Sequence, residues 1–141
     1  MAENDYRRVR VLWPDHLNLA RGKYLPTHLA HRGTKHSLTV FALGYDRDMG
    51  PVPGTGFLEG MPDMECHFDM SDVRPSWEEN IGVVIGDLER HGNPLELAPR
   101  KVLRNAVGAW EKHGFVPKVG IEFEAYLMQP DNNGNWVPYD S

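Results

Sequence analysis

Two glutamates lie one residue apart in the segment GIEFEAYL, which spans residues 120–127. Side chains alternate across a β-strand, so Glu122 and Glu124 would share one face while Ile121 and Phe123 share the other. Alternate residues of a strand lie about 6.6 Å apart along the backbone. Two unpaired carboxylates at that spacing repel each other, and one tends to hold a proton. Divalent cations remove this repulsion, and carboxylate oxygens suit Mg²⁺ or Mn²⁺.

The same spacing is wide for two ligands of one ion. It suits two ions, each bound by one glutamate and by further ligands from elsewhere in the protein. We therefore predict a metal-binding role for Glu122 and Glu124. The residues alone leave an alternative open, in which an edge strand exposes both carboxylates to water or pairs them with Lys and Arg. No catalytic or nucleotide-binding residue is assigned.

The elements around this segment follow from local patterns. Residues 99–113 predict an amphipathic helix, because Pro99 suits a first helical position and Gly114 suits a left-handed C-terminal cap. Its apolar face comprises Val102, Leu103, Ala106, Val107 and Trp110. Gly108 inside this helix costs about 1 kcal/mol relative to Ala and suggests close packing. Residues 118–128 predict the strand that carries the two glutamates, with its apolar side facing a core.

The first two thirds of the chain favour strands. We expect a hairpin of residues 9–13 and 21–26, further strands at 64–70 and 82–88, a turn at 91–94, and a Gly- and Pro-rich loop at 44–63. Residues 37–43 are apolar and fit either a strand or a helix. A turn at Asp131-Asn-Asn-Gly134 is followed by apolar Trp136 and Val137, which suggests that the chain is a piece of a longer protein.

Composition restricts the class of protein. The 141 residues carry a formal net charge of −5, which offers no electrostatic attraction for nucleic acid or an anionic membrane. A single cysteine, Cys66, excludes an internal disulfide. No signal peptide or membrane span is recognisable, so we expect a cytoplasmic protein.

An ordered set of short motifs resembles the glutamine synthetase family over about residues 9–140. VRVLWPD and RGKYLP are similar to the family's N-terminal hairpin. The run from MPDMECHFD to GNPLELAPR is similar to its Pro-Asp, Trp, Asp-terminated strand and Pro-Arg segments. PRKVLRNAVGAWEKHGF followed by VPKVGIEFEAYL looks like the first helix and first strand of its catalytic domain.

This resemblance implies an α+β protein. A β-grasp-like N-terminal domain would span 6–93, and the beginning of an α/β catalytic domain would span 94–141. Members of the family use ATP to convert the γ-carboxylate of glutamate to an acyl phosphate, which ammonia or another amine then attacks. The two glutamates of the E-x-E strand, here Glu122 and Glu124, would each bind a different Mg²⁺ or Mn²⁺ ion. Homo-oligomers built as stacked rings are expected, and the 141-residue chain alone would be inactive.

One departure concerns the acceptor. The family's Phe-Asp-Gly-Ser-Ser loop, whose Asp helps bind ammonium, is replaced here by GYDRDMGPVPG, so that role is not transferred to Asp46 or Asp48. A γ-glutamyl ligase that uses a polyamine or another amine is therefore an alternative to an ammonia ligase. A free-standing β-grasp interaction module without catalysis is the alternative from a different class.

Other residues of types that could bind metals or phosphate, or act as nucleophiles, are expected to have structural roles. We predict surface or packing positions for His28, His31 and His36, an inert thiol at Cys66, a flexible loop at 54–60, turn positions for Asp69 and Asp72, core positions for Trp77 and Trp110, and an exposed hairpin at 21–23 in preference to a phosphate contact.

Overall fold

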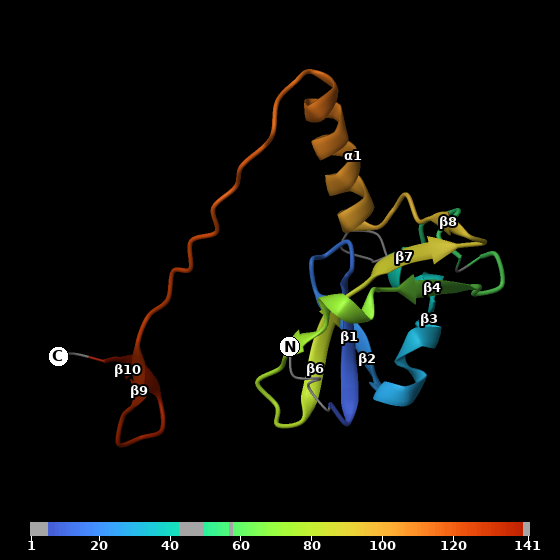
Figure 1. Cartoon of the computed structure of the whole chain (residues 1–141). Helices are drawn as coiled ribbons and strands as arrows, with labels where there is room; N and C mark the ends of the chain where they lie inside the picture. The colour runs from blue at the N-terminus through green and yellow to red at the C-terminus, as the bar shows by residue number, and fades with distance from the viewer. Residues whose placement is uncertain (1–5, 43–49, 57, 140–141) are drawn as a thin grey trace.

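The computed structural model describes residues 6–42, 50–56 and 58–139. Within these residues the chain forms a body with two four-stranded sheets, one α-helix that projects from it, and a separate two-stranded hairpin (Figure 1). The strands are β1 (Arg8–Pro14), β2 (Ala20–Pro26), β3 (Thr34–Ser37), β4 (Asp63–His67), β5 (Arg74–Pro75), β6 (Ile81–Ile85), β7 (Asp87–Arg90), β8 (Asn93–Pro94), β9 (Met128–Pro130) and β10 (Trp136–Pro138). The α-helix is α1 (Pro99–Lys112), and three short 3-10 helices span Thr27–Arg32, Leu38–Phe41 and Met70–Asp72.

The first sheet has the strand order β2-β1-β6-β5. Its central strand β1 pairs antiparallel with β2 and parallel with β6. Val9, Val11 and Trp13 alternate with less buried residues along β1, and all three lie in the core. This period of two is what turns one side of a strand inward. The hairpin predicted from residues 9–13 and 21–26 is therefore confirmed, as β1 and β2.

The second sheet has the order β3-β4-β7-β8, with antiparallel pairing throughout. The predicted strand at 82–88 is divided between the two sheets, as β6 and β7, and Gly86 lies between them. The Gly86 N–H donates to the carbonyl oxygen of Leu12 at 2.8 Å. A Cβ at Gly86 would lie 2.4 Å from Cys66 Sγ, so the crossing point requires a residue without a side chain.

The core lies between these sheets and the short helices beside them. Its largest fully buried side chains include Trp13, Leu38 and Met64. Leu95 and Ala98, which lead into α1, are also buried in this cluster. The ambiguous apolar run 37–43 contributes through the 3-10 helix Leu38–Phe41, whose first and last residues are buried. Core packing of the body therefore continues up to the first turn of α1.

Helix α1 agrees with its predicted bounds but has no buried residue. Gly114 adopts a left-handed φ of 79°, and its N–H donates to the Glu111 carbonyl oxygen at 2.9 Å, as a glycine cap should. The close packing expected at Gly108 is wrong for the described residues, because nothing lies within 4 Å of a Cβ built there. The apolar face, including Val102 and Trp110, is exposed.

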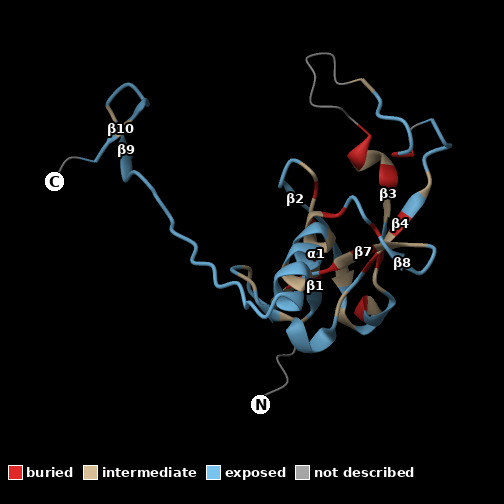
Figure 2. Ribbon diagram, turned by 90° about the horizontal axis from the view of Figure 1, so that it is seen from above, coloured by how far each residue is buried: buried red, intermediate tan, exposed pale blue. Residues whose placement is uncertain are grey.

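The strand predicted at 118–128 is not formed. Residues 115–127 run from the tip of α1 to the hairpin β9–β10 with no assigned strand, and they are exposed (Figures 1 and 2). The alternation of apolar and acidic residues is present, but a strand is stabilised by hydrogen bonds to a neighbour. Within the described residues no strand pairs with this segment, and of the expected region only Met128 lies in a strand, as the first residue of β9.

Candidate functional site

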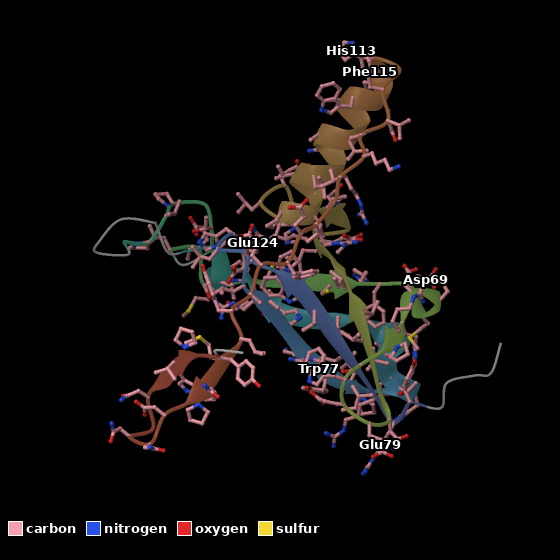
Figure 3. All side chains as sticks on the ribbon, turned by 90° about the vertical axis from the view of Figure 1, so that its left-hand side faces the viewer. Asp69, Trp77, Glu79, His113, Phe115 and Glu124 are labelled. Carbon is pink, nitrogen blue, oxygen red and sulfur yellow. The ribbon has the colours of Figure 1, made fainter. Side chains whose placement is uncertain are left out.

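Glu122 and Glu124 lie on the exposed segment between α1 and β9. Figure 3 labels Glu124 on this segment. The apolar side chains beside them are exposed as well, since Ile121 is 80% and Phe123 is 94% accessible. Both sides of the segment therefore face solvent in the described part of the chain. The expectation that its apolar side packs against a core is wrong for this structure, because the strands that would cover it are not among the described residues.

The carboxylate oxygens of the two glutamates suit a hard divalent cation, but two side chains supply fewer ligands than such a cation needs. Neither carboxylate has a hydrogen bond or an ion pair with another described residue. Among the described residues, no group of three or more His, Cys, Asp or Glu side chains is arranged to hold a metal ion. Hard cations need about six oxygen ligands. Glu122 and Glu124 fit a Mg²⁺ or Mn²⁺ site as two donors of a larger set, and their metal role stays a prediction.

An ion-pair cluster, which the motifs did not assign, links β7 to α1. Asp87 accepts hydrogen bonds from Arg100 Nε at 2.8 Å and from an Arg104 terminal nitrogen at 2.5 Å, each on a different carboxylate oxygen. Burial alone would raise the pKa of Asp87, but the hydrogen bonds and positive charge of the two arginines outweigh it and lower that pKa. Two sequence features could have pointed to this ion pair, since Asp87 lies at the end of a strand pattern and Arg100 belongs to the Pro-Arg motif.

A second unassigned cluster surrounds Arg10 on β1. Its guanidinium carbon lies 4.3 Å from the ring centroid of Trp77 and 5.5 Å from that of Tyr24. Glu78 joins the group through Arg10 at 3.2 Å and through the Tyr24 hydroxyl at 2.7 Å. Trp77 is 75% exposed, so the expectation that it belongs to the core is wrong. Trp110 is likewise exposed, at 55%, so the expectation of a core position is wrong for it too. It packs edge-on against Phe115. Phe115 lies at the tip of α1, away from Trp77 (Figure 3).

The structural roles predicted for the hairpin cations are supported. Arg21 Nε donates to buried Asp15 at 2.7 Å, and Lys23 Nζ donates to the Lys35 carbonyl oxygen at 2.5 Å. Asp15 also accepts from two backbone N–H groups of the β1–β2 turn, those of Leu17 and Leu19. Both cations therefore have partners within the protein, and residues 21–23 form part of an exposed hairpin strand, as predicted.

The other candidates are packing or turn residues. His36 bonds to Thr34 Oγ1 at 2.7 Å and lies edge-on to Trp13, whose ring centroid is 5.1 Å away. Burial raises the pKa of Cys66 to about 11, which keeps this thiol protonated and inert near neutral pH. Asp69 caps a short 3-10 helix through the Ser71 N–H, and Asp72 lies in that helix.

A carboxylate within the Gly-rich loop binds the loop's own backbone. The Glu59 carboxylate accepts from the N–H groups of Gly54 and Gly56, at 2.8 Å each. These two backbone donors are therefore satisfied within the loop. Asp46 and Asp48, considered above as ammonium-binding residues, lie outside the described residues, as does Phe57.

Comparison with known proteins relates the chain to ligases. It is 33% identical over 111 residues to a glutamate–isopropylamine ligase of a Pseudomonas species, an alignment that covers 75% of this chain and 24% of that protein. It is 30% identical over 138 residues to a glutamine synthetase of Methanosarcina mazei, covering 94% of this chain and 29% of that protein. The residues left outside the second alignment are fewer than the residues that follow Glu124 in the chain. The alignment therefore includes both glutamates.

The fold has solved relatives too. A structure titled as a GmaS/ADP complex superposes with a TM-score of 0.61 at 16% identity, covering 79% of this chain and 24% of that one. A structure titled as a novel glutamine synthase homolog superposes with a TM-score of 0.57 at 18% identity, covering 77% of this chain and 27% of that one. The fold is therefore of the glutamine synthetase type, with mixed helices and small sheets. A scan against models of protein families finds no match. None of the helices in the described part of the chain is long and apolar enough to cross a membrane.

These alignments cover only part of each relative. The chain spans about a quarter of the length of the curated relatives and the solved structures that it matches. The similarity nevertheless runs through most of the chain, and several relatives carry the same family name or the name of a γ-glutamyl-amine ligase. On this sequence and fold similarity, the chain belongs to the glutamine synthetase family.

Proposed function

We propose that this chain is the N-terminal part of an ATP-dependent ligase that forms a C–N bond at the γ-carboxylate of glutamate. Residues 6–93, which hold nearly all of the body, would be the β-grasp-like domain, and residues 94–141 would begin the catalytic domain. The γ-carboxylate is activated as an acyl phosphate, and ammonia or a larger amine then displaces the phosphate. Assembly into stacked rings and a cytoplasmic location belong to the same proposal.

One observation carries this proposal. The similarity to a glutamine synthetase extends through the segment that holds Glu122 and Glu124, and it does not stop at the body. The two side chains that the residue types alone nominate for cation binding thus lie inside the region shared with a ligase. Their exposure and lack of described partners leave both carboxylates free to bind an ion.

The chemical role of the two glutamates follows from the charge of phosphoryl transfer. Bound Mg²⁺ or Mn²⁺ would neutralise the charge that develops on a transferring phosphoryl group, which is where most of the catalysis of such reactions arises. Glu122 and Glu124 would each supply a carboxylate oxygen to a different ion, because alternate residues of an extended chain are too far apart to share one comfortably. Their apolar neighbours would anchor the segment in the surrounding sheet.

The uncovered apolar surface supports the assignment of 94–141 to a larger domain. Val102, Leu103 and Trp110 on α1 are exposed, as are Ile121 and Phe123 beyond it. Soluble proteins rarely leave such a large apolar surface exposed to water. The relatives are about four times as long as the aligned region, and a catalytic domain of that length would contain strands able to pair with residues 118–127.

A larger amine is the alternative acceptor. One relative is named for isopropylamine, and the Phe-Asp-Gly-Ser-Ser loop is absent from this sequence. A comparison of rates with ammonia, isopropylamine and a diamine, in the complete enzyme with glutamate and ATP, would separate the two. A higher kcat/KM for ammonia than for either amine would favour the glutamine synthetase activity.

The metal role is tested in the complete enzyme with Glu122→Gln and Glu124→Gln. We expect both variants to lose Mn²⁺-dependent ADP formation and to bind fewer Mn²⁺ ions in electron paramagnetic resonance titrations. Glu79→Gln is the matched control, since Glu79 is an exposed glutamate on the body, far from α1 (Figure 3). Wild-type activity and stoichiometry in both site variants would overturn the assignment. A complete protein that forms no ADP would favour the non-catalytic interaction module.

A further inference from the structure

Within the described residues, the side-chain hydrogen bonds and ion pairs of α1 with the chain before it lie in its first two turns, where Lys101 and Asn105 approach Glu96. None of its residues is buried, and its apolar face is exposed. The body ends at Leu95 and Ala98, which are buried in the core immediately before the helix. This connection fixes where α1 begins. It does not fix the direction in which a helix of 14 residues points, since a helix held only at its first residue can pivot there.

Asp87 on β7 supplies a second and a third point of attachment. One carboxylate oxygen accepts from Arg100 and the other accepts from Arg104. The arginines are four residues apart and therefore lie on the same face of α1, one turn from each other. A pivot of the helix about Ala98 would move Arg104 farther than Arg100, so both hydrogen bonds can be kept in only a narrow range of helix directions.

The direction of α1 is passed on to the chain that leaves it. The helix ends in a tight turn at Gly114, and the Phe115 N–H donates to the Trp110 carbonyl oxygen at 3.1 Å. The Phe115 ring packs edge-on against Trp110, with centroids 5.7 Å apart. Figure 1 shows the chain reversing at the helix tip and leaving as the extended segment. The start of the segment with Glu122 and Glu124 is therefore set by the last turn of α1.

We propose that Asp87 is a positioning residue, which clamps Arg100 and Arg104 and so sets the direction of α1 relative to the sheets. Through the turn at Gly114, the clamp sets where the E-x-E segment starts. The effect on metal binding rests on the function proposed above, whereas the effect on helix direction does not. Asp87 would contact neither substrate nor metal, and it would act on catalysis only through α1.

The clamp is tested directly by residual dipolar couplings of the 141-residue chain. In the wild type, N–H couplings from α1 and from β1 and β6 should fit one alignment tensor. In Asp87→Asn, which removes the charge and one of the two acceptor oxygens, we expect the α1 couplings to shrink and to require a separate tensor. Helical Cα chemical shifts should remain in α1, because the change affects orientation and not helix formation.

Matched variants separate the clamp from general damage. Glu65→Gln removes a carboxylate from the neighbouring strand β4, whose partners Lys35 and His67 both lie outside α1, so its couplings should match the wild type. Asp87→Glu keeps two acceptor oxygens and should restore part of the common tensor. If Asp87→Asn disturbs the sheets, the double variant Arg100→Gln/Arg104→Gln removes the same bonds from the helix side. A common tensor in that double variant or in Asp87→Asn would overturn the proposal.

A kinetic measurement in the complete enzyme distinguishes the clamp from the proposed metal site. Residues that orient metal ligands typically alter metal affinity by 10- to 100-fold, so Asp87→Asn should raise the Mn²⁺ concentration for half-maximal activity roughly tenfold. Excess Mn²⁺ should restore its kcat but not that of Glu122→Gln. If Glu122→Gln is fully active while Asp87→Asn frees α1, the metal site is wrong and the clamp stands. A wild-type Mn²⁺ dependence in Asp87→Asn would overturn the link from clamp to site.

Discussion

The body and the region from α1 onward both contain periodic patterns of apolar residues. The body buries these residues, whereas the region from α1 onward exposes them. In the body, the alternation along β1 places Val9, Val11 and Trp13 in a closed core. In the region 99–139, the helical apolar face and the alternating strand pattern are both exposed (Figure 2). The difference lies in what each pattern has to pack against within the described chain.

This contrast shows that a periodic pattern specifies a local conformation and a face, but not a partner. Strand β1 has hydrogen-bonding neighbours on both sides, in β2 and β6. The segment 118–127 pairs with no strand among the described residues and stays extended. The body should therefore account for the cooperative stability of the chain, and the region after Ala98 should contribute little. Four measurements test this difference between the two regions.

The largest effect is expected for Trp13→Ala. Trp13 is 1% exposed at the centre of the core, and truncation of such a side chain costs about 3–5 kcal/mol. Trp110→Ala, in the exposed face of α1, should change the free energy of unfolding by less than about 0.5 kcal/mol. Urea denaturation followed by circular dichroism measures both. Equal losses for the two tryptophans would mean that α1 is packed in solution.

A smaller effect is expected on acidification. Burial, with the charge of Lys23, lowers the pKa of His36 from 6.5 to about 4. The unfolded chain therefore binds a proton that the folded body excludes, and the free energy of unfolding should fall as pH drops from about 6.5 to about 4. The full shift corresponds to on the order of 3 kcal/mol, which solvent screening of this half-buried ring reduces to about 2 kcal/mol.

His36→Gln should flatten this part of the stability profile, measured by urea titrations at a series of pH values. His31→Gln, at an exposed position of the body, should leave it unchanged. An acid-dependent loss of the same size in His36→Gln would assign the titration to other groups.

Gly86→Ala should destabilise the body by about 1–3 kcal/mol through overpacking. The added Cβ would lie 2.4 Å from Cys66 Sγ and 2.8 Å from the His67 carbonyl oxygen. Thermal unfolding of this variant reports the loss. A midpoint equal to that of the wild type would show that the crossing between β6 and β7 has space that the structure lacks.

Gly108→Ala should have the smallest effect and the opposite sign. Nothing lies within 4 Å of a Cβ at this position, so the change should stabilise α1 by up to about 1 kcal/mol through helix propensity alone. Helical content at low denaturant should rise while the urea midpoint of the body stays the same. A loss of stability would indicate a neighbour packed against this face.

Several elements could be predicted from local patterns because their causes are local. The bounds of α1 follow from Pro99, the helical periodicity and Gly114, and β1 follows from strict alternation. The two candidate metal ligands also come from spacing alone, and their role remains a prediction. The exposed positions of Trp77 and Trp110 could not be predicted, because a large aromatic residue says nothing by itself about which surface covers it.

The family, the amphipathic helix and the hairpin β1–β2 could be read from the sequence, since they depend on residue order and short-range periodicity. The fold was needed to show that residues 82–88 divide between two sheets at Gly86, that Asp87 binds Arg100 and Arg104, and that 118–127 has no strand partner among the described residues. Each of these depends on residues that are distant in sequence or on an adjacent strand. Periodicity can identify the face that needs a neighbour, but only packing shows whether the neighbour is there.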